Sequence, residues 1–132
     1  MAQHLQFSVD MALGCSTNTV LHIAALCNEA EIPFELQLIN EISKVTPNLC
    51  KLAPSGAHHV QDLHRAGGVM AVMAELAKNR LIDTEVATVT GQSLGKNLEK
   101  VTILDSDVIK TCDNPYSKNG GLAVLFGNLA PN

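Results

Sequence analysis

The sequence has 132 residues and a formal net charge of −4, and 46% of its residues are hydrophobic. This length suffices for one ordinary domain and excludes a large two-domain α/β enzyme. With three Phe, one Tyr, no Trp and no run of Lys or Arg, the chain lacks the positive charge and stacking surfaces that nucleic-acid binding needs. No apolar stretch reaches the roughly 20 residues that cross a bilayer, and no signal-peptide pattern is present. Composition therefore predicts a cytoplasmic protein that binds neither nucleic acid nor membrane.

Four cysteines, Cys15, Cys27, Cys50 and Cys112, are spread along the chain without a close pair. Structural zinc sites draw their ligands from closely spaced Cys and His residues, and disulfide-stabilised folds are shorter and richer in cysteine. We therefore expect reduced cysteines that behave as small apolar residues and hold no metal.

The first part of the chain has the apolar spacing of helices. The polar residues Ser16–Asn18 follow a Leu-Gly-Cys turn and can accept hydrogen bonds from the first amides of a helix, so we expect a helix from there to about Ala30. Its apolar residues lie on nearly every side, which is typical of a helix packed on most faces. Three further helices are expected over Glu35–Val45, Val60–Arg65 and Val69–Arg80.

The composition changes near Asp83, after which Thr and Val alternate and Gly and Asn become frequent. Residues 85–90 alternate like a strand, and residues 122–126 form an unbroken apolar run of the kind found in strands covered on both faces. Ser93 can cap a brief helix that ends at Leu98. The sequence thus predicts an α/β (α+β) fold whose N-terminal two thirds are helical and are followed by a β-rich segment.

The segment Gly14–Asn18 gathers small polar side chains where a turn leads into a helix. Amide groups at such a position, with the positive end of the helix dipole, can bind a carboxylate or a phosphate. An ordinary helix cap is the alternative. His22 follows Asn18 by four residues and so projects from the same helix face, as an acid, a base or a hydrogen-bond donor to substrate, or simply as a core histidine.

Two further groups resemble catalytic or metal-binding patterns only loosely. His58, His59 and His64 lie near Asp62, but their spacing does not place three ligands on one helix face, so we interpret them as a polar surface loop. A helix dipole can lower the pKa of the Cys15 thiol, yet the sequence places no His/Asp pair beside it as a base. From the residues alone we therefore predict no catalytic residue and no metal ligand.

Several motifs in matching order nevertheless resemble one family, and together they cover nearly the whole chain. They are DMALGCSTNTVLH at 10–22, DLHRAGG at 62–68, VTG at 89–91, DNPYS at 113–117, the pair Gly120–Gly121, and GNLAP at 127–131. This pattern resembles an internal stretch of the dihydroxy-acid dehydratases, which form one family with phosphogluconate and sugar-acid dehydratases.

The resemblance implies an iron–sulfur hydro-lyase of isoleucine and valine biosynthesis. Such an enzyme removes water from a 2,3-dihydroxy-3-methyl acid to give the 2-keto acid. The family's chemistry is Lewis-acid activation: an open iron of the cluster takes the 3-hydroxyl, magnesium holds the substrate's oxygens, and a deprotonated serine takes the C2 proton.

Two motifs that the resemblance links to catalysis are absent, the Cys-Asp-Lys motif of the cluster and magnesium site and the Thr-Asp-Gly-Arg segment near the catalytic serine. We therefore expect an internal fragment that is inactive alone and holds neither iron–sulfur cluster nor magnesium. Many relatives have Gly in place of Cys15, which argues against a cluster ligand there. The resemblance implies a supporting role, on the wall of the cluster and substrate pocket, for Ser16, Thr17, Asn18 and His22.

The resemblance also suggests where the domains lie. Residues 1–83 resemble the last helices of the family's N-terminal α/β domain, and residues 84–132 resemble the linker and first strands of its C-terminal β-barrel domain. Apolar surface that lacks its cover is expected to cause homo-oligomerisation or self-association. The alternative is a stand-alone module, derived from that family, that binds a small anion or serves in assembly.

Overall fold

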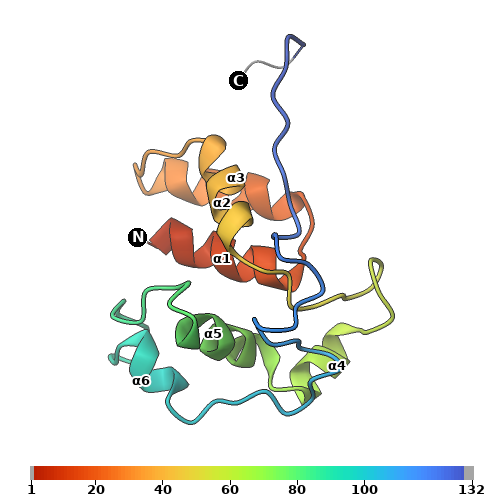
Figure 1. Cartoon of the computed structure of the whole chain (residues 1–132). Coiled ribbons are helices and arrows are strands. Elements are labelled where there is room, and N and C mark those ends of the chain that lie inside the picture. Colours follow the sequence, from red (N-terminus) through yellow and green to blue (C-terminus); the bar gives the residue numbers. More distant parts are fainter. Residues whose placement is uncertain (1, 130–132) are drawn as a thin grey trace.

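The computed structural model describes residues 2–129. Figure 1 shows α1 between α3 on one side and α5 on the other, with α4 and α6 packed against α5. Because α1 contacts α2, α3 and α5, it is the central element of the fold. The helices of the described chain are α1 (Ala2–Leu13), α2 (Asn18–Glu29), α3 (Gln37–Val45), α4 (Val60–Arg65), α5 (Gly68–Lys78) and α6 (Leu94–Leu98).

The helices expected from apolar spacing are confirmed, with bounds shifted by one or two residues. The predicted cap of α6 is also confirmed, because the Ser93 side chain accepts a hydrogen bond of 3.3 Å from the Lys96 amide. The side-chain hydrogen bond that we expected to cap the start of α2 is not present. Thr17 is the N-cap residue, but its side chain makes no capping bond.

Helix α1 is missing from the sequence-based expectation. Its buried side chains include Phe7, Met11 and Ala12, all fully inaccessible. Phe7 and Met11 are four residues apart and so lie on one face, where Phe7 stacks on Phe34 with a centroid distance of 5.7 Å. The signal was the four-residue spacing of large apolar side chains, which is diluted here by polar residues on the other faces.

The expected β-rich segment is not observed, and this corrects the predicted fold class. Within residues 2–129 the chain has only isolated bridges, such as Ala87 with Ser93, and no strand pairs over residues 85–90 or 122–126. A strand needs a neighbouring backbone for its amides and carbonyls. Residues 85–90 have one only in the short return of the chain at residues 92–94, which gives a single bridge, and no backbone of the described chain pairs with residues 122–126. At Val124 a side chain takes that place: the Asn40 amide donates to the Val124 carbonyl and accepts from the Val124 amide, both at 2.8 Å.

The core has two parts that meet at α1. One lies against α5 and includes Leu49, Val72, Leu76 and Ile109, and the other lies against α3 and includes Phe7, Met11, Ile39 and Ile42. Helix α2 is covered less than its composition led us to expect. Only Ile23 and Cys27 are buried on it, whereas Leu21 and Leu26 are 69% and 59% exposed. Within the described residues, no helix has the length and apolar character that a membrane span requires.

Candidate functional site

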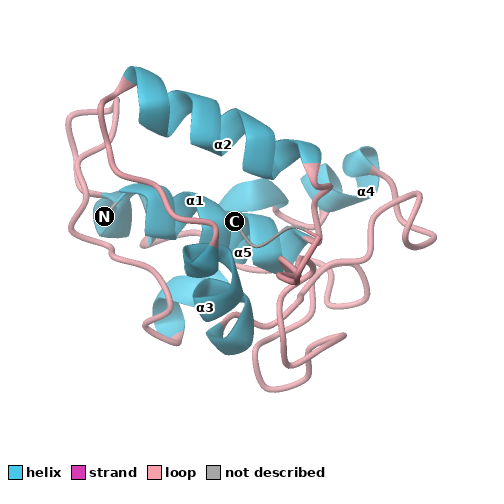
Figure 2. Ribbon diagram, turned by 90° about the horizontal axis from the view of Figure 1, so that it is seen from above, coloured by secondary structure: helices cyan, strands magenta, loops and turns pink. Residues whose placement is uncertain are grey.

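A cleft of about 640 Å³ opens where α1 ends and α2 begins. Figure 2 shows α2 running back along α1, with its start beside α4. Two chain segments line the cleft, one at residues 13–19 and the other at residues 52–61. The polar side chains on its wall are those of Cys15, Ser16, Thr19, Ser55, His59 and Gln61.

The turn that shapes this cleft depends on Gly14, whose φ of +67° lies in the left-handed region. The carbonyl of Asp10 accepts hydrogen bonds from the amides of Gly14 and Cys15, at 3.0 and 3.3 Å, and these bonds close the end of α1. A Cβ at Gly14 would also lie 2.8 Å from Nδ2 of Asn48. A glycine is therefore needed at this position for two separate reasons.

The sequence-predicted residues lie near the cleft but do not all face it. Ser16 lines the cleft, and the Asn18 amide donates a 3.2 Å hydrogen bond to its hydroxyl. Thr17, Asn18 and His22 are exposed and are not among the lining residues. Thr19, Ser55 and Gln61, which the sequence did not single out, come to the cleft through folding, and so does His59, which the sequence placed in a polar surface loop.

His59 is the N-cap residue of α4 and forms a reciprocal pair with Asp62. The His59 amide donates to the Asp62 carboxylate at 2.8 Å, and the His59 side chain accepts from the third residue of the helix. With a side chain that is 68% exposed, His59 belongs to the surface region that the sequence indicated. Its position beside the cleft adds a titratable ring to the wall.

Burial controls the electrostatics at the start of α2. Burial, reinforced by the neighbouring Asp10 carboxyl, raises the pKa of the Cys15 thiol to about 12, so the thiolate suggested by the helix dipole does not form at neutral pH. Burial also raises the pKa of Asp10, against a smaller lowering by Cys15 and Thr19. Those two groups face Asp10, but neither carboxylate oxygen has a hydrogen-bond partner of ordinary geometry among residues 2–129.

The cysteines do not offer a ligand set for a metal cluster. All four are free thiols, and burial raises the pKa of Cys50 to about 12 and of Cys112 to about 11. A cluster requires thiolates that converge on one point. Across residues 2–129, no three His, Cys, Asp or Glu side chains gather in the way that a metal site needs. The residues present therefore do not fit an iron–sulfur cluster.

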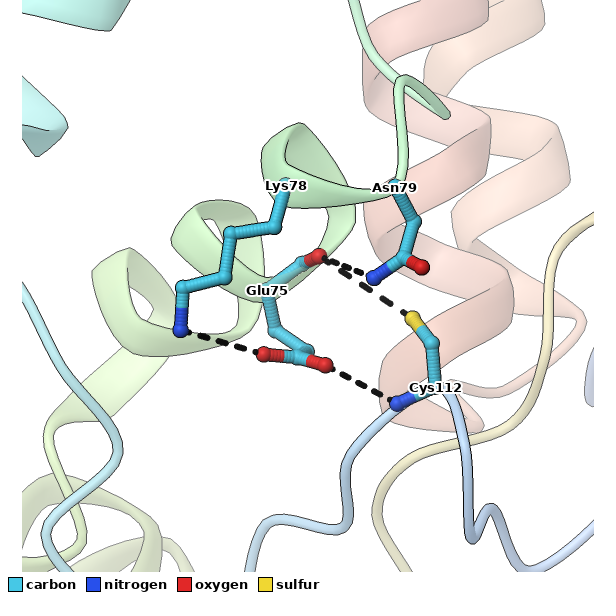
Figure 3. Close-up of polar contacts among 4 residues, drawn as sticks. All are labelled: Glu75, Lys78, Asn79 and Cys112. Atoms are coloured by element: carbon cyan, nitrogen blue, oxygen red, sulfur yellow. Dashed lines mark hydrogen bonds and ion pairs between the residues drawn. The ribbon is translucent and has the colours of Figure 1, made fainter.

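A buried carboxylate on α5 has a structural task instead. Figure 3 shows Glu75, which is 6% exposed, between Lys78 and the backbone of Cys112. One oxygen accepts from the Cys112 amide at 3.0 Å, and the other lies 3.4 Å from the Lys78 ammonium. The Asn79 side chain donates to the Glu75 carbonyl at 3.0 Å. These contacts attach the segment around Cys112 to α5 and give both carboxylate oxygens of Glu75 a structural partner.

Comparison with known proteins gives one consistent result. Residues 6–97 match the family model described as the N-terminal part of dihydroxy-acid/6-phosphogluconate dehydratases. The chain is 57% identical over 124 residues to a dihydroxy-acid dehydratase of Desulfatibacillum aliphaticivorans and 56% identical to that of Carboxydothermus hydrogenoformans. A dihydroxy-acid dehydratase of Acetivibrio thermocellus is 57% identical. Each match covers 94% of this chain and 22% of the relative, so the chain spans about a fifth of their length.

Proposed function

This chain belongs to the dihydroxy-acid/6-phosphogluconate dehydratase family, and on that premise we propose that it is part of a dihydroxy-acid dehydratase. The parent enzyme removes water from a 2,3-dihydroxy-3-methyl acid to give a 2-keto acid, a step of branched-chain amino-acid biosynthesis. The observation that carries this proposal is the 57% identity over 94% of the chain to an enzyme of that name. The matches named above are to dihydroxy-acid dehydratases, which favours a branched dihydroxy acid over a sugar acid as substrate.

In the parent, an iron–sulfur cluster and a magnesium ion would supply Lewis acids for the departure of the hydroxyl. Residues 2–129 contain no ligand set for either group, so we assign their ligands to other parts of the parent. This chain contributes a wall of the pocket and no catalytic residue. By itself it is expected to be inactive.

We assign the supporting role on that wall to Ser16, Thr17, Asn18 and His22. Ser16 carries the assignment best, because its hydroxyl lies on the cleft and is oriented by the Asn18 amide. Thr17, the N-cap residue of α2, and His22, on the helix, are exposed, and a neighbouring part of the parent can pack against them. That neighbouring part would bring the substrate, or the residues that bind it, next to the side chains of Thr17 and His22.

The domain boundary and the state of assembly are part of the same proposal. Residues 1–83 belong to the N-terminal domain, and residues 84–132 lead into the C-terminal β-barrel, where residues 122–126 would gain a partner strand. The family match through residue 97 includes most of the first range and continues beyond it. Exposed Leu21, Leu26 and Leu125 favour self-association of the isolated chain. A cytoplasmic location suits this biosynthetic role.

A chimera tests the proposed function. The matched 124 residues of the Carboxydothermus hydrogenoformans enzyme are replaced by those of this chain, and the product is assayed anaerobically with 2,3-dihydroxyisovalerate and with 6-phosphogluconate. We expect dehydration of the first substrate at a rate no more than about tenfold below that of the unmodified enzyme, because about 1.4 kcal/mol covers small repacking losses.

The isolated chain, reconstituted with iron, sulfide and magnesium, is the control and should give no product. A chimera that folds and shows iron–sulfur absorption, yet leaves the dihydroxy acid unchanged, would contradict the proposal. Turnover by the isolated chain would contradict it as well, and would favour a self-sufficient enzyme.

A further inference from the structure

A second hollow, of about 430 Å³, lies between α1, α2 and α5 and shares Leu13, Cys15 and Thr19 with the cleft described above. Its wall is apolar and is formed by Leu5, Val9, Leu13, Ile23 and Met73. Asp10 belongs to the same lining, with Cys15 and Thr19 beside it. We call this hollow the Asp10 groove.

Asp10 is the unusual member of the groove. It is 3% exposed, and each of its carboxylate oxygens exposes less than 1 Å² and lacks a hydrogen-bond partner within residues 2–129. A carboxylate removed from water without a partner costs several kcal/mol, so buried acids in folded proteins are paired with donors or cations. Cys15 and Thr19 face Asp10 without forming hydrogen bonds of ordinary geometry, so its carboxyl has neutral neighbours and no charged partner in the groove.

The described residues do not supply a cation for it. The lining of the groove holds no Lys, Arg or His. Besides the short side chains of Cys15 and Thr19, its other polar side chain is that of Gln6, which is neutral. An apolar wall with one buried acid is complementary to a side chain that has a long apolar stem and a charged end, which describes Arg and Lys. A hydrated divalent ion suits it poorly, because such ions prefer several oxygen ligands.

We infer that the Asp10 groove is the docking site for a cationic side chain, Arg or Lys, from a part of the parent polypeptide outside this chain. The inference rests on the proposed function, since the relatives have over four times the length of the matched region to supply such a segment. The stem of the incoming side chain packs against Val9 and Ile23.

The sign of one substitution tests this pairing. In the isolated chain, Asp10→Asn removes an unpaired buried charge and should raise the midpoint of urea unfolding at pH 7. In the chimera described above, the same substitution would leave the incoming cation buried without its partner, so the thermal midpoint should fall by several degrees. Asp113→Asn, at an exposed acid, is the matched control and should change neither midpoint. If Asp10→Asn raises the midpoint in the chimera too, Asp10 has no partner there and the inference is wrong.

A small probe separates a cation from a neutral donor. The isolated chain is titrated with n-butylguanidinium and, in parallel, with n-pentanol, while the methyl resonances of Leu5, Val9 and Ile23 are followed by NMR. We expect saturable shifts with the guanidinium that weaken about tenfold in affinity in Asp10→Asn, as for loss of a charged hydrogen bond. Equal binding of both probes, or equal binding by wild type and variant, would overturn the assignment to a cation.

These readouts do not depend on catalysis. A chimera without dehydratase activity that still shows the opposite effects of Asp10→Asn would reject the proposed function and retain the docking site. An active chimera in which Asp10→Asn raises the midpoint, as it does in the isolated chain, would retain the proposed function and reject the docking site.

Discussion

Cys15 lies between the end of α1 and the start of α2, where a helix dipole alone would favour a thiolate. Its surroundings act in the other direction, because burial comes first among the causes that raise its pKa to about 12 and the nearby Asp10 adds to it. The helix dipole is a partial charge that acts over one turn, whereas loss of hydration penalises the whole charge of the thiolate. A thiol at this position is therefore a packing group that stays protonated at neutral pH.

The expected reactivity of Cys15 follows from that pKa. A pKa raised to about 12 leaves far less thiolate at pH 7.5 than an ordinary cysteine has. Iodoacetamide should therefore modify Cys15 far more slowly in the native chain than in 8 M urea, as measured by mass spectrometry of the peptide that contains it. Native labelling as fast as in urea would contradict this description of the site.

At the scale of elements, the C-terminal segment is attached by side chains instead of by a strand ladder. The Asn40 amide on α3 makes two hydrogen bonds to the Val124 backbone, both at 2.8 Å. The Glu75 side chain on α5 accepts one hydrogen bond from the Cys112 amide, at 3.0 Å. Two helices thus use side-chain groups to hold this segment at Cys112 and Val124, in addition to backbone hydrogen bonds between those two positions. Figure 1 shows the chain beyond Val124 running away from the helices.

Asn40→Ala tests the first of these attachments. The substitution removes both bonds to Val124, so the Val124 amide should lose protection against hydrogen exchange and the unfolding free energy should fall by about 1–2 kcal/mol. Asn40→Asp is the matched control, because it keeps the acceptor for the Val124 amide and loses only the donor. It should give an intermediate effect, and equal protection in all three chains would refute the role of Asn40.

How far each element could be predicted depends on where its interactions come from. Helices such as α3 and α5 were predicted because their apolar spacing and their backbone bonds are local. Residues 122–126 have the composition of a strand, but a strand exists only beside another backbone, and none lies there in the described chain. The residues of the candidate site also divide into those that local sequence predicts and those that it does not. Ser16 follows from local turn chemistry, whereas His59 reaches the cleft only through the packing of α4 near the start of α2.

At the scale of the whole molecule, a segment late in the chain is hydrogen-bonded to the end of α1 and to α3. The Gly121 amide donates to the Met11 carbonyl at 3.2 Å, and the Gly120 amide donates to the Ser43 carbonyl at 2.8 Å. A Cβ at Gly121 would lie 2.7 Å from the Cα of Gly14. The late segment therefore passes directly over the turn that shapes the cleft, so the stability of the cleft and the position of this segment are coupled.

Gly121→Ala should disturb the contact between this late segment and the Gly14 turn. The added methyl meets the backbone of Gly14, which cannot rotate away as a flexible side chain can, so the unfolding free energy should fall by about 1–3 kcal/mol in urea titrations. Gly127→Ala is the control, since a Cβ there meets nothing within 4 Å and should leave the midpoint within about 0.5 kcal/mol of the wild type. Because the strain falls on the Gly14 turn, amide resonances of Cys15 and Ser16 should shift in Gly121→Ala and stay in place in Gly127→Ala. Equal midpoints and unchanged resonances in both variants would show that the segment does not hold the turn.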